Sequence, residues 1–167
     1  MKLSGYQVKN FKSCNGLDGI AYSGQIARND IKVAEFINSG DGGETDVEFI
    51  SREAREQFAL CLKDAGFDSL DMGLAVMADA ADGLKGFKKK LKNQTCAWGK
   101  DTEAGMITTK DFPYDDALAN RENVFHQRLR KTFPNGYLVL NELSDDELWD
   151  LWLGWQIDSY QKEVKVA

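Results

Sequence analysis

Residues 20–37, IAYSGQIARNDIKVAEFI, decide the fold class. Apolar and polar residues alternate along both halves of this stretch, and a period of two is typical of β-strands. Asn29-Asp30 lies between the halves, and both residue types tolerate the left-handed backbone that a tight hairpin turn requires. The stretch therefore predicts two antiparallel strands, Ile20–Arg28 and Ile31–Ile37, joined by a short turn.

The flanking residues extend this hairpin into a meander over residues 1–50. Tyr6–Phe11 precedes it as another strand-like run, and the glycine-rich residues Ser39–Gly43 lead into a fourth strand, Thr45–Ile50. Phosphate-binding glycine loops lead into helices, whereas a strand follows here. We therefore interpret these glycines as turn residues that supply positive φ.

Residues 51–92 carry two helical patterns. Ser51 is a suitable N-cap for a helix running to about Asp64, and apolar residues recur at three- and four-residue intervals over Ser69–Leu91. Gly83 and Gly86 weaken the end of the second pattern, so a break is an option there. Both helices are expected to pack on one face of the sheet.

Residues 93–142 predict further strands and one helix, in the order Thr95–Trp98, Met106–Thr109, helix Ala117–Lys131 and strand Tyr137–Leu140. In residues 143–167, Ser144 and Glu147 have the spacing of a capping box, which predicts a helix beginning at Ser144. The whole predicts an α+β fold: a mainly antiparallel sheet of six or seven strands, helices on one face and a C-terminal amphipathic helix.

Length and composition indicate one ordinary globular domain covering residues 1–167. Apolar residues make up 43% of the chain and charged residues 29%, and a net charge of -6 disfavours attraction to nucleic acid or to an anionic membrane. Cys14, Cys61 and Cys96 are odd in number and widely spaced, which indicates free thiols in a reducing compartment. With no signal-peptide pattern or apolar run of spanning length, we expect a cytoplasmic protein.

Five short motifs together resemble small uncharacterised proteins common in phages and mobile elements. They are Lys9-Asn10-Phe11, Gly19, Lys32-Val33-Ala34, Gly42-Gly43-Glu44 and Leu140-Asn141-Glu142. The resemblance covers most of residues 6–142 and implies a genomic setting in a bacterial host rather than an activity. The helix Ser69–Leu91 and the segment after Ser144 depart from the pattern, so a function particular to this chain would reside there.

The sequence offers few residues for catalysis. His126 is the only histidine, so a serine or cysteine triad would have to use it, and no nucleophile signature accompanies it. A carboxylate magnesium site needs no histidine, and its candidates gather around a proline-containing loop: Asp111, Asp115, Asp116 and Glu122. Solvated turn acids are the more ordinary interpretation. No catalytic residue, metal ligand or cofactor is therefore assigned.

One basic run could contact phosphates. It consists of Lys85, Lys88, Lys89, Lys90 and Lys92. Such contacts would be non-specific and salt-dependent. Cations are also favoured near a helix C-terminus by the helix dipole, which is the structural interpretation of the same run.

The C-terminal helix is the most informative candidate for partner binding. Trp149, Trp152 and Trp155 follow the acidic pair Asp145 and Asp146. The apolar face that the sequence predicts consists of Leu148, Leu151, Trp152 and Trp155. This face either packs into its own domain or binds a partner, and tryptophan is frequent both in cores and at binding hot spots.

These observations favour a non-enzymatic accessory protein of a phage or mobile element that binds and occludes a host protein, for instance one of a defence system. A magnesium-dependent enzyme acting on nucleotides or nucleic acid is the first alternative, and non-specific nucleic-acid binding through the lysine run is the second. A homodimer formed through the C-terminal helix is a further option.

Overall fold

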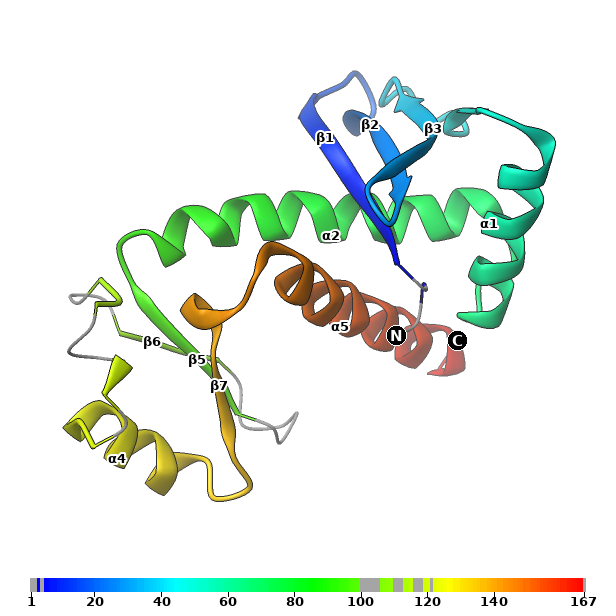
Figure 1. Ribbon diagram of the computed structural model, residues 1–167. Helices are drawn as coiled ribbons and strands as arrows, with labels where there is room; N and C mark the ends of the chain where they lie inside the picture. Colours follow the sequence, from blue (N-terminus) through cyan, green and yellow to red (C-terminus); the bar gives the residue numbers. More distant parts are fainter. Residues whose placement is uncertain are drawn as a thin grey trace. The chain divides into compact units, whose positions relative to one another are not determined.

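Seven strands and four helices make up the part of the chain that the structure describes, and the α+β class is confirmed (Figure 1). The computed structural model describes residues 3, 5–99, 106–109, 113–115, 119–120 and 122–166. The strands are β1 (Tyr6–Asn15), β2 (Ile20–Arg28), β3 (Ile31–Asn38), β4 (Asp46–Phe49), β5 (Thr95–Gly99), β6 (Met106–Thr109) and β7 (Tyr137–Val139). The helices are α1 (Arg52–Asp64), α2 (Leu70–Leu91), α4 (Val124–Thr132) and α5 (Asp145–Val166), with a 3-10 turn η1 (Leu140–Glu142).

The expected number of strands is present, but the strands are divided between two antiparallel sheets, β1-β2-β3-β4 and β6-β5-β7. The chain forms two compact units, of which unit 1 comprises residues 1–84 and 149–167 and unit 2 comprises residues 85–148. The first sheet belongs to unit 1 and the second to unit 2. That residues 1–167 fold as one domain stays a prediction.

The β2–β3 hairpin has the turn that the sequence predicts. Asn29 and Asp30 have φ values of 49° and 65°, the left-handed conformation of a tight two-residue turn. Lys9 of the neighbouring strand forms an ion pair with Asp30 at 3.2 Å. The conformation of the turn therefore follows from the backbone preferences of Asn29 and Asp30.

Helices cover one face of the four-stranded sheet. The ring of Phe58 on α1 lies 5.0 Å from that of Tyr6 and 5.9 Å from that of Phe49. Ile26 and Phe36 are buried on the same side. Burying rings of this size removes a large apolar area from water, which is the main stabilising contribution to this core.

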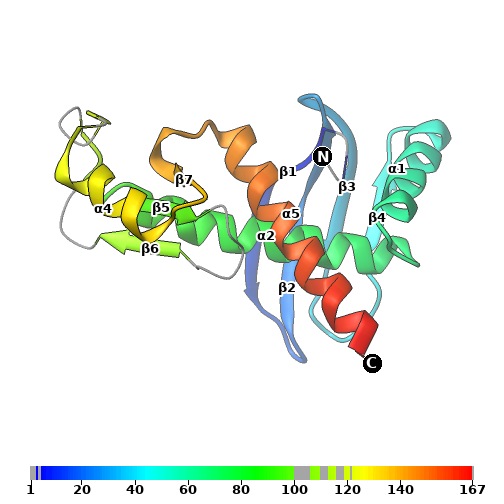
Figure 2. The ribbon, with the colours of Figure 1, turned by 90° about the horizontal axis from the view of Figure 1, so that it is seen from below.

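In unit 1, α5 packs on α2 and crosses it at an angle, as Figure 2 shows. A Cβ atom added at Gly83 would lie 2.8 Å from Nε1 of Trp152, so the missing side chain lets the indole approach the helix. The hydroxyl of Tyr160 on α5 lies 3.6 Å from Sδ of Met72 on α2. Helix α2 continues through Gly83 and Gly86, because packing outweighs the low helix propensity of glycine.

In unit 2, the three-stranded sheet and α4 share a small core. It consists of Ala97, Leu129, Phe133 and Val139. Helix α4 begins at Val124 with Asn123 as its N-cap, and Asn120 and Glu122 are not helical, so the predicted helix does not run unbroken to Lys131 from Ala117, which lies outside the described residues. The side chain of Asn123 accepts a hydrogen bond from the backbone N–H of Phe125, and this cap fixes the start of α4. Positions 116–118 lie outside the described residues.

Gly40 is expected to be the least replaceable residue of the turn before β4. Its φ is +68°, and a Cβ atom added there would lie 2.6 Å from the backbone nitrogen of Ala21. Because alanine would meet both backbone strain and a clash with backbone, we expect Gly40→Ala to lower the free energy of unfolding by at least about 3 kcal/mol.

Gly42 is the matched control, since its φ is +82° but a Cβ atom would meet nothing within 4 Å. Gly42→Ala should therefore lower the free energy of unfolding by only about 1 kcal/mol, because it adds backbone strain without a clash. Urea unfolding followed by tryptophan fluorescence measures both changes. Equal losses for the two variants would show that the clash at Gly40 has no energetic weight.

Candidate binding surface

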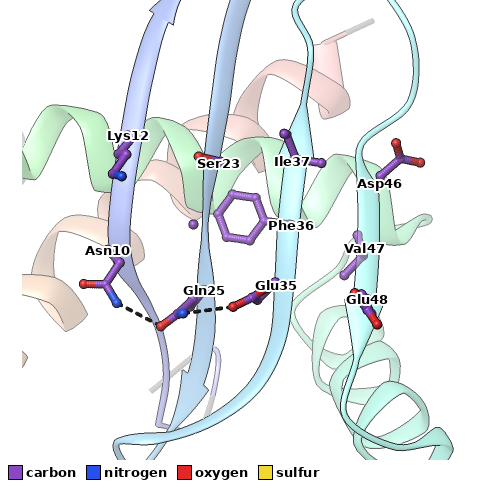
Figure 3. Close-up of a pocket in the computed structure, with 11 residues that line it drawn as sticks. Asn10, Lys12, Ser23, Gln25, Glu35, Phe36, Ile37, Asp46, Val47 and Glu48 are labelled. Carbon is purple, nitrogen blue, oxygen red and sulfur yellow. Dashed lines mark hydrogen bonds between the residues drawn. The ribbon is translucent and has the colours of Figure 1, made fainter.

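The face of the four-stranded sheet that carries no helix forms a shallow hollow of about 580 Å³. We call it the open sheet face, and define it by the side chains of Asn10, Lys12, Ser23, Gln25, Glu35, Ile37, Asp46 and Glu48. In Figure 3 these residues come from all four strands, and the ribbons of α2 and α5 lie behind the sheet. Gly24, Phe36 and Val47 also line the hollow.

The strands that form this face contain two irregularities, and the first brings a polar side chain onto it. Lys9 pairs with Gln25 and Lys12 with Ser23, so two residues of β1, Asn10 and Phe11, stand opposite one residue of β2. Asn10 has a φ of 54°, which asparagine tolerates better than most residues. The result is a β-bulge that directs Asn10 toward Gln25. A second register shift, in the β2–β3 pairing, leaves Val33 as an extra residue of β3.

A row of hydrogen bonds crosses three strands of the open sheet face (Figure 3). Asn10 Nδ2 donates to Gln25 Oε1 at 2.9 Å, and Gln25 Nε2 donates to Glu35 Oε1 at 3.0 Å. Lys32 Nζ donates to the same Glu35 oxygen at 2.6 Å. The hydrogen bonds from Lys32 and Gln25 hold the pKa of the Glu35 carboxyl below its ordinary value. Glu35 is thus a fixed, ionised member of the face.

The part of the open sheet face that β3 and β4 form is acidic. Glu35 on β3 stands directly opposite Glu48 on β4, and Ile37 stands directly opposite Asp46. Directly opposed residues share a face and have Cβ atoms about 5 Å apart. Ile37 is 57% exposed, so an apolar side chain lies in the open among these carboxylates.

The three tryptophans of α5 have different environments. Trp149 is 4% exposed, and its Nε1 donates a hydrogen bond to the backbone oxygen of Tyr6 at 2.9 Å. Trp152 is half-buried, with its ring 5.9 Å from that of Trp155, which is 46% exposed. Trp149 therefore belongs to the core of unit 1, and Trp155 is the ring of the three that offers most surface.

The buried face of α5 is rotated from the one that the sequence predicted. Trp149, Leu153 and Ile157 are buried at successive four-residue steps, whereas Trp155 is exposed. Of the predicted face, Leu148 is buried and Trp155 is exposed, so that face is only partly inside the protein, and whether Trp155 binds a partner stays a prediction. The capping box at the start of the helix is confirmed: Glu147 Oε2 accepts a hydrogen bond from the backbone N–H of Ser144 at 2.8 Å.

The acidic pair and the lysine run both lie in unit 2. Asp145 and Asp146 are exposed in the first turn of α5, and Asp145 forms an ion pair with Lys88 at 2.6 Å. Four lysines of the run are exposed, namely Lys85, Lys89, Lys90 and Lys92. Lys89 and Lys90 lie in the last turn of α2, where the helix dipole favours cations, whereas Lys85 lies further from that end. Phosphate contact by this run stays a prediction.

His126 is part of the core of unit 2. Its exposed fraction is 0%, and its Nδ1 lies 2.8 Å from the hydroxyl oxygen of Tyr137. The two rings also stack, with centroids 5.8 Å apart. A buried, hydrogen-bonded histidine of this kind is a structural element rather than an accessible base.

The carboxylates proposed for magnesium are only partly described. Asp115 and Glu122 are exposed, and Asp111 and Asp116 lie outside the described residues. Within the described ranges, no three His, Cys, Asp or Glu side chains come together to hold a metal ion.

The cysteines are free thiols, and burial raises the pKa of the Cys96 thiol above its ordinary value.

Comparison with protein-family models, with curated proteins and with solved structures gave no significant match. None of the helices in the described part of the chain has the length and hydropathy that a membrane span requires.

The open sheet face was not among the predicted sites. Its one sequence signal is the charged Glu35 between the apolar Ala34 and Phe36 of β3, which indicates a strand with one solvated face.

Proposed function

We propose that the chain is a non-enzymatic binding protein that occludes a surface of a host protein through the open sheet face. The observation that carries the proposal is an uncovered, hollowed sheet face on which the exposed Ile37 is surrounded by polar and charged side chains. Protein interfaces typically combine an apolar centre with a polar rim. The arrangement around Ile37 has both parts.

The resemblance to small phage and mobile-element proteins supports the setting of this proposal, the cytoplasm of a bacterial host. A protein of this kind would act by covering a site on a host defence or regulatory protein. Trp155 in unit 1 and the acidic pair Asp145 and Asp146 in unit 2 are two further, separate candidate contacts. The first contact is the open sheet face, because its residues share one surface.

A capture experiment tests the proposed function. The full chain is immobilised, incubated with lysate of a bacterial host, and compared with Ile37→Lys and Leu60→Lys. Leu60 is the matched control, since it is 62% exposed but lies on α1. We expect a protein that binds the wild type and Leu60→Lys alike and binds Ile37→Lys at least about tenfold more weakly, as measured with the purified partner. Capture of the same proteins by the wild type and by both variants would contradict the proposal.

A further inference from the structure

The charge of the chain is concentrated in unit 1. This unit has 17 Asp and Glu against 10 Lys and Arg, a net charge of -7, whereas unit 2 has 10 against 11. The field of unit 1 therefore attracts cationic partners and repels anionic ones. On the open sheet face the acids are Glu35, Asp46 and Glu48, and the one lysine in the lining is Lys12.

The carboxylates of Asp46 and Glu48 are available to pair with a ligand. Glu35 is engaged by Lys32 and Gln25, so part of its charge is offset within the sheet. Asp46 and Glu48 are exposed on β4, and in the described part of the chain neither forms an ion pair or side-chain hydrogen bond. Glu48 also faces Glu35 directly, and like charges at opposed positions destabilise a sheet. A cation placed between Glu35 and Glu48 would remove that repulsion.

The spacing of the acids matches an extended chain. Asp46 and Glu48 are two residues apart on one strand, so their side chains leave the same face about 6.8 Å apart. Alternate residues of any extended segment have the same repeat. Ile37 lies beside Asp46 and gives the aliphatic stem of a bound lysine or arginine an apolar surface to cover.

We propose that the open sheet face binds an extended segment of the partner protein that carries arginine or lysine at alternate positions. The basic side chains pair with Asp46 and with the Glu35–Glu48 pair, and arginine suits a carboxylate best because its guanidinium can donate two parallel hydrogen bonds. This inference rests on the proposed function and names the chemistry of the partner.

The test uses a short peptide in which arginine alternates with threonine, titrated into the full chain at low ionic strength. Asp46→Asn/Glu48→Gln removes two charges from the face while keeping side-chain shape. Asp64→Asn/Asp68→Asn removes the same number from exposed positions of unit 1 off the sheet. We expect the first double variant to weaken peptide binding at least about tenfold and the second less than about twofold, with amide shifts on β3 and β4.

Three results would overturn the inference: no binding of the peptide to the wild type, equal weakening by both double variants, or spermidine binding as tightly as the peptide. The last would indicate a site for a small polycation rather than for a protein segment. Failure of the cationic-segment proposal can be distinguished from failure of the proposed function. If a captured partner loses affinity with Ile37→Lys but keeps it with Asp46→Asn/Glu48→Gln, the cationic segment is wrong while the proposed function stands.

Discussion

Replacing Trp149 with alanine is expected to lower the free energy of unfolding by about 3–5 kcal/mol, whereas Trp155→Ala should lower it by less than about 1 kcal/mol. Both residues are tryptophans on the same helix, but Trp149 is 4% exposed and Trp155 is 46% exposed. Trp149→Ala also leaves the backbone oxygen of Tyr6 without its indole donor. The cavity and the lost hydrogen bond act in the same direction.

Urea unfolding followed by far-ultraviolet circular dichroism measures both variants without relying on tryptophan fluorescence. Trp149→Phe serves as a second variant, because it keeps most of the ring volume and loses the hydrogen bond, and its loss should be intermediate. Equal stabilities of Trp149→Ala and Trp155→Ala would mean that Trp149 does not pack in the core, and would restore it as a candidate for partner binding.

Asn141→Leu is the second change with a large expected effect, a loss of at least about 3 kcal/mol. Asn141 Oδ1 accepts a hydrogen bond from the backbone N–H of Cys96 at 2.8 Å. Its Nδ2 donates to the backbone oxygens of Leu91 and Gln94 at 3.0 and 2.9 Å. One side chain thus joins the end of α2, the start of β5 and η1. Leucine has a similar volume but pairs with none of the three backbone groups.

Asn93→Leu is the matched control, since Asn93 is an exposed asparagine in the same unit, and it should change stability by less than about 0.5 kcal/mol. Hydrogen exchange at the Cys96 amide gives a local measurement, and this amide should lose protection in Asn141→Leu. If Asn141→Leu and Asn93→Leu proved equally stable, the three hydrogen bonds would carry no net free energy.

The sequence predicted the features that depend on neighbouring residues. The turn at Asn29-Asp30 follows from the backbone preferences of two residues, and the N-caps at Ser51 and Ser144 follow from hydrogen bonds within one helical turn. The role of Asn141 was not predicted, because the three backbone groups that it pairs with lie 45 to 50 residues earlier in the chain.

Features set by long-range packing could not be predicted in the same way. In β3, Phe36 is buried and the adjacent Ile37 is exposed, yet both are large and apolar, so alternation does not tell which side faces the core. The sequence likewise did not tell whether the side of α5 with Trp149 or the side with Trp155 faces the core. The open sheet face depends on four strands and a bulge at Asn10, and no single stretch of sequence contains that information.

The bulge in β1 has a consequence for the behaviour of the protein in concentrated solution. β1 is an edge strand of ten residues, and an uninterrupted edge of that length is a template on which another copy could polymerise. The extra residue at Asn10 breaks the regular repeat of backbone donors and acceptors, and Lys9 and Lys12 place charge on either side of the break. We therefore expect the irregularity that shapes the hollow to disfavour the addition of further copies of the chain, strand to strand, into fibres.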